Sequence, residues 1–376
     1  MKRIFLTVLC LLWQASSYAA DNLLLISLDG LRWQEVFSGA DSDLIGNKDY
    51  VKNPETLKAE FWAENAQERR QKLMPFLWQT VATKGVLLGN RHNNSPMQVA
   101  NPWFFSYPGY SEMLTGKVDP LINSNNKIPN PNVTFLEWAN QQPEYKNRVA
   151  AFGSWDVFPY ILNTGRSGLP VNAGFMPASH ADLSGRELYL NELQSETPSP
   201  WENVRLDVFT YQYTREYIRA EQPRIIYVSL GETDDFAHDG NYAAYLRSAH
   251  RDDEFIGRLW NYLQTLDQYR DNTALLITTD HGRGQNADDW LHHASGRAIQ
   301  GYLKSLTAYA KGIIGSDQVW FAAMGPGIRA AGELPLEKPA ELQQVTATAL
   351  QALGIRKNDF SKKAAPALQQ IFEQEL

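Results

Sequence analysis

The stretch ALLITTDHG (residues 274–282) joins an apolar run to an acidic and a basic side chain. Its first residues lack the polar alternation of a half-exposed strand, so they predict a strand that is buried on both faces of a sheet. Asp280 and His281 follow where this strand ends, and Gly282 suits a turn. The pair is therefore either part of a simple turn or a pair of functional groups at a sheet edge.

Four further runs predict buried strands of the same kind, and we expect all five to run parallel. They are NLLLISLDG (22–30), RVAAFGSW (148–155), PRIIYVSLGETD (223–234) and QVWFAAMGPG (318–327). Helical patterns lie between them, in TFLEWANQQ and over 242–266, and ELQQVTATALQALGI predicts a helix with a short terminal strand. Alternating strands and helices predict an α/β fold, a three-layer sandwich with a mostly parallel central sheet.

The segment from about 117 to 205 is richer in Asn, Pro and Gly than the rest of the chain. We expect it to form an insertion of long loops, or a small cap, over one end of the sheet. No internal repeat and no linker of low complexity divides the chain. We therefore expect one domain over 21–376.

The N-terminus has the layout of a signal peptide over residues 1–20. Lys2 and Arg3 precede a short apolar run, and small residues then offer a cleavage site. No other stretch holds the ~18 uninterrupted apolar residues of a membrane helix. We expect an exported bacterial protein, periplasmic or secreted, without a transmembrane anchor after cleavage.

The composition excludes several kinds of chemistry. The single cysteine, Cys10, lies in the signal peptide, so the mature chain has no disulfide and no catalytic thiol. Loss of Lys2 and Arg3 changes the formal net charge from −7 to about −9. This acidic balance argues against nucleic acid as the main partner. A small phosphorylated substrate stays compatible, because a bound metal ion reverses the local field.

Acidic residues recur at predicted strand ends. Asp29 ends the first strand and Asp234 follows the strand at 223–234, like Asp280 after its own strand. Ligands bind at the carboxyl ends of parallel strands, so the three carboxylates are expected at one edge. Each alone is also compatible with a helix cap or a turn. Asp234 and His238 share a helical face, as a chelating pair or as a surface ion pair.

A second source of imidazole is the pair His292 and His293. The alternative interpretation of this pair is two exposed loop residues without a metal-binding role. With them, the chain offers two sets of three carboxylate and imidazole ligands, which suit Zn²⁺. Two such ions would clamp the attacking and leaving oxygens of a displacement at phosphorus. Ser106, directly before Tyr-Pro-Gly, is the hydroxyl to test between them, although it is also compatible with a turn or a helix cap.

These motifs, in their order along the chain, resemble the alkaline phosphatase superfamily. The series is Asp29, SYPGYSEMLTG, DDFAH, TTDHG, HH and MGPG, which spans the chain to about Gly327. The most similar branch is that of the nucleotide pyrophosphatases and phosphodiesterases. The resemblance implies an alkaline-phosphatase-like fold and two divalent metal ions, most simply Zn²⁺.

The resemblance also implies roles for individual residues. Ser106 would be the nucleophile, and Asn125 would donate to a phosphoryl oxygen, with Asn123 and Asn126 as alternatives. One zinc ion would be held by Asp234, His238 and His293. We prefer His293 to His292 because Trp290 lies three residues before it. The other ion would be held by Asp29, Asp280 and His281.

The function that follows is hydrolysis of a phosphate mono- or diester through a phosphoseryl intermediate. Tyr107-Pro108-Gly109 departs from the usual phosphodiesterase pattern after the nucleophile. Gly109 and Tyr110 replace the Ser-Arg that sulfatases need for modification of their nucleophile. Two alternatives stay open: a sulfate- or phosphonate-ester hydrolase of the same superfamily, and a non-catalytic, metal-stabilised binding protein of the cell envelope. Arg283 either touches substrate or forms a structural ion pair.

Overall fold

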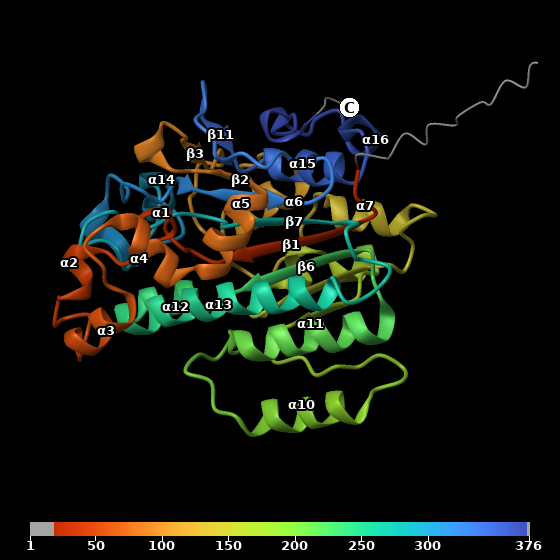
Figure 1. Ribbon diagram of the computed structural model, residues 1–376, viewed down its shortest axis with the longest axis horizontal. Coiled ribbons are helices and arrows are strands. Elements are labelled where there is room, and N and C mark those ends of the chain that lie inside the picture. The colour runs from red at the N-terminus through yellow and green to blue at the C-terminus, as the bar shows by residue number, and fades with distance from the viewer. Residues whose placement is uncertain (1–18, 374–376) are drawn as a thin grey trace, which may run out of the picture.

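The computed structural model describes residues 19–373, which fold around a central eight-stranded sheet (Figure 1). The strand order is β10-β2-β9-β7-β1-β6-β4-β5. These strands are β1 (Asn22–Leu28), β2 (Gly85–Leu88), β4 (Val149–Gly153), β5 (Val171–Ala173), β6 (Ile225–Leu230), β7 (Thr273–Thr278), β9 (Phe321–Met324) and β10 (Gly332–Glu333). A small second sheet has the order β11-β3-β8, from β3 (Met97–Gln98), β8 (Gln318–Val319) and β11 (Ala340–Glu341).

The central sheet is mostly parallel, which confirms the predicted fold class. β1 pairs in parallel with β6 and β7 on its two sides, and β4 continues the parallel set to the edge strand β5. The predicted strand at 318–327 differs: β9 runs antiparallel to both β7 and β2. An apolar run predicts burial in a sheet, but it carries no signal for strand direction, so this prediction was wrong.

Helices cover both faces of the sheet. Those before residue 200 are α1 (Trp33–Ser38), α2 (Ser42–Ile45), α3 (Pro54–Phe61), α4 (Ala66–Leu73), α5 (Ala82–Lys84), α6 (Ser106–Thr115), α7 (Phe135–Gln141), α8 (Phe158–Ile161), α9 (Thr164–Ser167) and α10 (Gly185–Glu196). The later ones are α11 (Asp207–Glu221), α12 (Glu232–His238), α13 (Tyr242–Leu263), α14 (Gly296–Gln300), α15 (Gln344–Ala352) and α16 (Lys357–Phe360). Figure 1 shows α11 and α13 on one side of β1 and β6, with α6 and α15 on the other.

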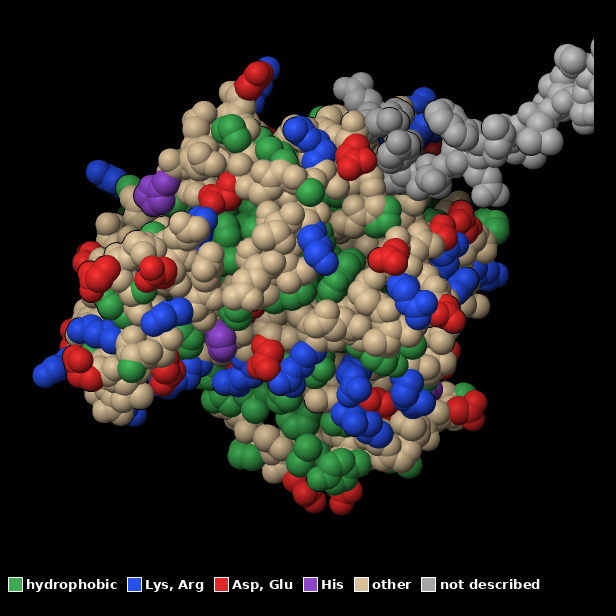
Figure 2. Space-filling model, viewed as in Figure 1, with side chains coloured by type: hydrophobic (Ala, Val, Ile, Leu, Met, Phe, Trp, Pro, Cys, Tyr) green, Lys and Arg blue, Asp and Glu red, His purple; other side chains and the backbone are tan. Residues whose placement is uncertain are grey.

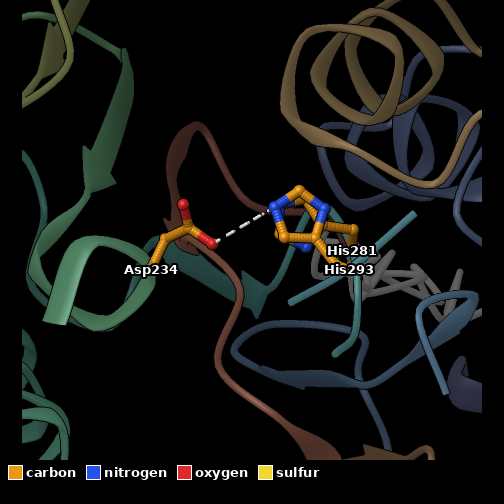
Figure 3. A group of neighbouring side chains, drawn as sticks. All are labelled: Asp234, His281 and His293. Carbon is orange, nitrogen blue, oxygen red and sulfur yellow. Dashed lines mark ion pairs between the residues drawn. The ribbon is translucent and has the colours of Figure 1, made fainter. Parts of the chain in front are cut away.

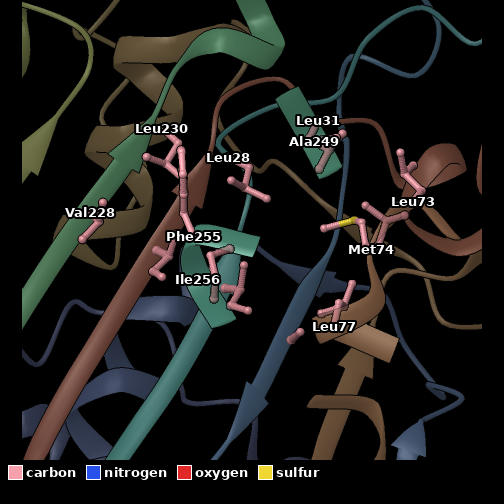
Figure 4. Close-up of a cluster of buried hydrophobic side chains, with 14 of the residues drawn as sticks. Leu28, Leu31, Leu73, Met74, Leu77, Val228, Leu230, Ala249, Phe255 and Ile256 are labelled. Carbon is pink, nitrogen blue, oxygen red and sulfur yellow. The ribbon is translucent and has the colours of Figure 1, made fainter. Parts of the chain in front are cut away.

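Two hydrophobic cores lie on opposite faces of the sheet. In β1, Leu24, Ile26 and Leu28 face one core, whereas Leu23 and Leu25 face the other, as the two-residue period of a strand requires. The first core receives α13 (Figure 4). Each fully buried Leu or Ile contributes about 1.5–3 kcal/mol, so the strand that ends in Asp29 is firmly held.

The segment 117–205 and the two ends of the chain were also subjects of prediction. Within 117–205, β4 and β5 belong to the central sheet, whereas 120–133 runs as a loop. The predicted C-terminal helix is present as α15, but α16 follows it in place of the expected strand, so that part of the prediction was wrong. Residues 1–18 of the predicted signal peptide lie outside the described residues. No helix over residues 19–373 is long and apolar enough to cross a membrane.

Candidate active site

Three carboxylates meet where neighbouring strands of the sheet end. Asp29 follows β1, Asp280 follows β7, and Asp234 lies in α12 directly after β6. All three surround the Nε2 atom of His281. This nitrogen lies 3.3 Å from Oδ1 of Asp29, 3.4 Å from Oδ2 of Asp280 and 3.8 Å from Oδ1 of Asp234. Because β7, β1 and β6 are neighbours in the sheet, the residues that follow them lie together in one cluster.

A second group of ligands adjoins the first at Asp234. Nε2 of His238 lies 3.3 Å from Oδ2 of Asp234 and 3.1 Å from Nε2 of His293. Nε2 of His293 is 3.7 Å from Oδ1 of Asp234. Figure 3 shows the Asp234 carboxylate facing the overlapping imidazoles of His281 and His293, which stack with their centroids 3.7 Å apart. Asp234 thus lies between the two groups.

Hydrogen bonds set the tautomers of the two buried histidines. Nδ1 of His281 lies 2.9 Å from the carbonyl oxygen of Gly282, and Nδ1 of His293 lies 3.1 Å from that of Phe104. A carbonyl oxygen only accepts, so each Nδ1 carries the proton. The lone pair of each neutral ring is then on Nε2, the atom that faces the carboxylates, as in a metal-ligating histidine.

The buried carboxyl groups of the cluster would be stabilised in their charged form by a cation. Burial and the nearby Asp234 raise the pKa of Asp29, and burial with the nearby Asp29 raises that of Asp280. Burial disfavours a charge on His281, but Asp280, Asp29 and Asp234 outweigh it and raise its pKa to about 9. Carboxylates packed this closely repel one another unless a positive charge lies between them.

Two buried oxygens identify where such a cation fits. Oδ1 of Asp29 and Oδ2 of Asp280 have no hydrogen-bond donor among the described residues. Ligand atoms of Asp29, Asp280 and His281 lie within 4.8 Å of one another, as do those of Asp234, His281 and His293. Oxygen and nitrogen donors in these sets suit a divalent ion such as Zn²⁺. The residues present therefore fit the metal chemistry that the resemblance implies.

The backbone around these ligands is adapted to bring them close. Gly30, at φ +60°, turns the chain directly after Asp29, and a Cβ atom there would lie 2.6 Å from Oδ1 of Asp234. The hydroxyl of Thr233 donates to the carbonyl of Asp29 at 2.6 Å, which ties α12 to the end of β1. Asp207 accepts from the backbone N–H groups of Gly231 and Glu232 at the start of α12, as a capping carboxylate does.

Ser106 is the first residue of α6, and the helix places it beside the ligands. Its Oγ lies 3.2 Å from Nε2 of His281, and the residue is 5 % exposed. Gly109 makes this approach possible, because a Cβ there would lie 2.3 Å from the carbonyl oxygen of Asp280. The departure from the usual pattern at Gly109 thus has a packing reason. A hydroxyl at a helix N-terminus also gains from the helix dipole when it ionises.

Of the three candidate asparagines, Asn125 lines the same cleft, whereas Asn123 and Asn126 do not. Its Oδ1 accepts a hydrogen bond from the backbone N–H of Tyr107 at 3.0 Å. This bond identifies the oxygen of the amide and leaves Nδ2 without a partner among the described residues. Asn125 can therefore donate to a ligand next to Ser106.

Sequence reasoning missed Tyr110. Its hydroxyl donates to Oδ2 of Asp29 at 2.9 Å and accepts from Oγ of Ser229 at 3.0 Å. Tyr110 follows Ser106 by one helical turn, so the i, i+4 spacing was an available signal. The structure also decides the role of Arg283, which is buried against Asp234 and the carbonyls of Trp290 and Leu291. Arg283 forms a structural ion pair with Asp234 and does not line the cleft.

The cleft in front of the ligands has a volume of about 380 Å³. Its polar lining residues include Asp29, Ser106, Asn125, Asn203, Asp234, Asp235, His238, His292 and His293. Its large apolar lining residues are Phe105, Trp155, Val204, Leu303 and Leu306. His292 reaches the cleft as well, but within the described structure no ion pair joins it to Asp234, unlike His293.

Comparison with models of protein families identifies the family of this chain. The model described as "Type I phosphodiesterase / nucleotide pyrophosphatase" matches residues 45–367, which include Ser106 and the candidate ligands from Asp234 to His293. The chain belongs to this family. It is thereby a member of the alkaline phosphatase superfamily of hydrolases, as the motifs predicted. Asp29 lies before the matched residues and is joined to the site by the fold.

Solved structures show the same fold at low sequence identity. This phosphodiesterase-family chain is similar to the alkaline phosphatase PafA, with a TM-score of 0.57 and 11 % identity over 94 % of this chain and 99 % of that one. It is also similar to a 2-O GAG sulfatase, with a TM-score of 0.55 and 15 % identity over 95 % of this chain and 75 % of that one. A search of curated protein sequences finds no match.

Proposed function

We propose that this chain hydrolyses phosphate esters through Ser106, with diesters preferred to monoesters. The observation that carries the proposal is the position of Ser106 Oγ, 3.2 Å from Nε2 of His281, in front of three strand-end carboxylates. A serine in a turn or a plain helix cap has no need of such neighbours. A nucleophilic hydroxyl requires them, directly or through bound metal.

Two divalent ions, most simply Zn²⁺, complete the proposed site. Asp29, Asp280 and His281 would hold one, and Asp234, His238 and His293 would hold the other. When bound, the ions would supply positive charge that acidifies a hydroxyl and stabilises the oxygens of the reacting phosphoryl group. Asp234 contacts both groups, so its carboxylate would separate and orient the two sets.

The residues of the chain divide the reaction into two steps. Ser106 Oγ would release its proton to solvent and attack phosphorus, the bond to the leaving oxygen would break, and a phosphoseryl group would form on Ser106. The departing alkoxide takes a proton from solvent. Water then attacks the phosphoseryl group, which restores the serine hydroxyl and releases the phosphate product. Nδ2 of Asn125 would donate to a non-bridging oxygen in both steps.

The charge of the cleft supports the preference for diesters. None of the described residues that line it is a lysine or arginine, and Asp235 adds a further carboxyl group to the wall. A monoester dianion brings one more negative charge than a diester, and no cationic side chain is among the described residues that line the cleft. The apolar lining residues Phe105, Leu303 and Leu306 instead suit an organic substituent of a diester.

The organisation of the chain completes the proposal. We propose that residues 1–20 are a signal peptide and that residues 21–376 form one exported catalytic domain, capped by loops within 117–205. The substrate would then be a small phosphorylated compound outside the cytoplasm, and nucleic acid would not be its main partner. The acidic composition of the chain supports the last point.

A substrate panel with matched variants tests this function. The purified protein, loaded with Zn²⁺, would be assayed with bis-p-nitrophenyl phosphate, p-nitrophenyl phosphate and p-nitrophenyl sulfate. We expect the highest kcat/KM for the diester, and loss of roughly a thousandfold or more in Ser106→Ala. Ser111→Ala is the control, because Ser111 lies buried in the same helix and bonds to Asn130 instead.

The outcomes separate the candidates. A phosphate group trapped on Ser106 after acid quench would establish the nucleophile. Preferred turnover of the sulfate ester would replace the proposal by the sulfatase alternative. Full metal content with no turnover of any ester would favour the non-catalytic binding protein.

A further inference from the structure

The exposed large hydrophobic side chains of the described chain fall in three segments, which form two groups. One group lies within 121–133 and 302–314 and consists of Leu121, Ile128, Val133, Tyr302 and Ile314. The other lies within 175–193 and consists of Phe175, Met176, Leu188, Tyr189 and Leu193. Single exposed apolar residues are ordinary on a protein surface, but groups of them mark binding surfaces.

The first group borders the opening of the active-site cleft. Asn125 comes from one of its segments and Leu303 from the other, and both line the cleft. Nε1 of Trp103 donates to the carbonyl of Pro120 at 3.2 Å, while the ring of Tyr302 stacks on Phe105 at 5.6 Å. Trp103 and Phe105 belong to one small cluster, so both segments are anchored at the same place. We call residues 120–128 and 301–311 the cleft rim.

The charge of the cleft rim is opposite to that of the whole chain. Its charged residues are Lys127, Lys304 and Lys311, and it contains no Asp or Glu, although the chain has 42 acidic against 35 basic residues. Lys127 pairs with Asp156 at 2.6 Å. Lys304 and Lys311 are exposed and form no ion pair with any described residue. The segment that carries Tyr302 thus also carries two cations that form no ion pair with any described residue.

The side chains themselves have the composition of an interfacial surface. Leu121 is 81 % exposed, Ile128 60 % and Tyr302 40 %. Aliphatic residues enter the boundary between headgroups and acyl chains, tyrosine prefers that boundary, and lysine binds anionic headgroups while its stem lies along apolar surface. We propose that the cleft rim docks on a lipid bilayer that carries anionic headgroups.

The second apolar region differs from the cleft rim in the charged residues that lie beside its exposed hydrophobic side chains. Figure 2 shows hydrophobic side chains over α10, the helix that carries Leu188 and Tyr189. Glu192 and Glu196 are exposed on that helix, so an anionic surface would be repelled there. Arg186, the one cation of α10, pairs with Glu216 at 2.8 Å, so the charges of this helix that form no ion pair with a described residue are acidic. Exposed apolar side chains thus lie in both regions, next to unpaired charge of opposite sign. α10 is therefore an internal control for the bilayer proposal.

Docking in this orientation would place the cleft opening at the membrane surface. A phosphoester at the level of the headgroups could then reach Ser106 without leaving the bilayer. The binding itself requires no turnover and no metal ion. Its test is therefore independent of the proposed function.

Vesicle co-sedimentation tests the proposal. The purified protein would be mixed with phosphatidylcholine vesicles that either lack or contain phosphatidylglycerol. We expect wild type to bind the anionic vesicles, and Leu121→Asp/Ile128→Asp to bind them roughly tenfold or more weakly. The matched control is Leu188→Asp/Tyr189→Asp, which places the same charges on α10 and should bind like wild type. Near-UV circular dichroism would show that both double variants remain folded.

A charge variant and a soluble polyanion complete the test. Lys304→Glu/Lys311→Glu should weaken binding to the anionic vesicles severalfold, because both cations are removed. Heparin in place of vesicles should not be bound, since it offers charge without an apolar phase. The proposal is overturned if wild type does not bind anionic vesicles, or if it binds heparin and not vesicles. Equal loss of binding in the α10 variant overturns it as well.

Discussion

The hydroxyl of Tyr110 donates a hydrogen bond to Oδ2 of Asp29 at 2.9 Å, in the buried floor of the active site. Tyr110 lies one turn after Ser106 on α6, and Asp29 ends β1. This single bond joins the helix of the proposed nucleophile to the strand that ends in a proposed metal ligand. It also holds one oxygen of Asp29, whereas the other, Oδ1, has no donor among the described residues and faces His281.

Tyr110→Phe is expected to weaken metal binding. The substitution removes the only side-chain donor to Oδ2 of Asp29 among the described residues, so this ligand is less well oriented. Loss of such a supporting bond typically lowers metal affinity about 10–100-fold. A competition titration with a fluorescent zinc chelator measures the change. Tyr107→Phe is the matched control, because its hydroxyl bonds to the carbonyls of Ile128 and Tyr160, away from the ligands.

His293→Ala is expected to remove one of two bound ions, whereas His292→Ala should retain both. Nε2 of His293 contacts His238 and Asp234, and the ring is held by Phe104 through Nδ1. The neighbouring His292 has no such ion pair in the described structure. Elemental analysis of the dialysed variants gives the metal content per chain. If His292→Ala loses the ion and His293→Ala keeps it, the assignment of the ligand is reversed.

Asn125→Ala should lower kcat/KM for a diester without changing the metal content. Removal of one donor to a developing phosphoryl charge typically costs about 2.7–4 kcal/mol, or 10²–10³-fold. The effect should appear mainly in kcat, because the donor acts more strongly in the transition state. Asn126→Ala serves as the control, since Asn126 is exposed and does not line the cleft. Equal effects of the two substitutions would contradict the role of Asn125.

Asp252→Asn should change the pH dependence of stability. Asp252 is fully buried, neither of its oxygens has a donor among the described residues, and burial with the nearby Asp207 and Glu232 raises its pKa well above the ordinary value. The folded chain therefore retains a proton that the unfolded chain releases. The free energy of unfolding falls as pH rises above the unfolded pKa, by up to about 1.4 kcal/mol per pH unit, until the folded pKa is reached.

Asparagine carries no such proton, so Asp252→Asn should gain stability relative to wild type as pH rises. Urea unfolding at a series of pH values from 5 to 8 measures the difference (roughly the range where native proteins are most stable). The neighbouring Asp253 differs in its contacts, because it accepts from the backbone N–H groups of Phe76 and Leu77, although burial raises its pKa to about 7 as well. Asp253→Asn weakens these two bonds, so it should destabilise the chain by about 1–3 kcal/mol above about pH 7. A constant difference between wild type and Asp252→Asn across this range would contradict the prediction.

Local pattern was sufficient to predict the layers of the fold and the edge where the ligands meet. The apolar runs that end in Asp29 and Asp280 predict buried strands, and the rule for parallel sheets then places their last residues together. Helical spacing predicted α13 and α15 in the same way. Pattern failed for the direction of β9 and for the expected strand after α15. Both depend on which partner a segment finds, and burial alone does not specify a partner.

The sequence by itself determined which residues end each strand, because periodicity and turn residues act over a few neighbours. Only the tertiary structure decided the contacts between atoms. Ser106 and His281 are 175 positions apart, yet Oγ and Nε2 lie 3.2 Å from each other. That distance depends on Gly109, which lets α6 pack against the Asp280 backbone, and on the strand order β7-β1-β6. Packing and strand pairing are non-local, so a pattern read along the chain names the reacting groups without fixing their geometry.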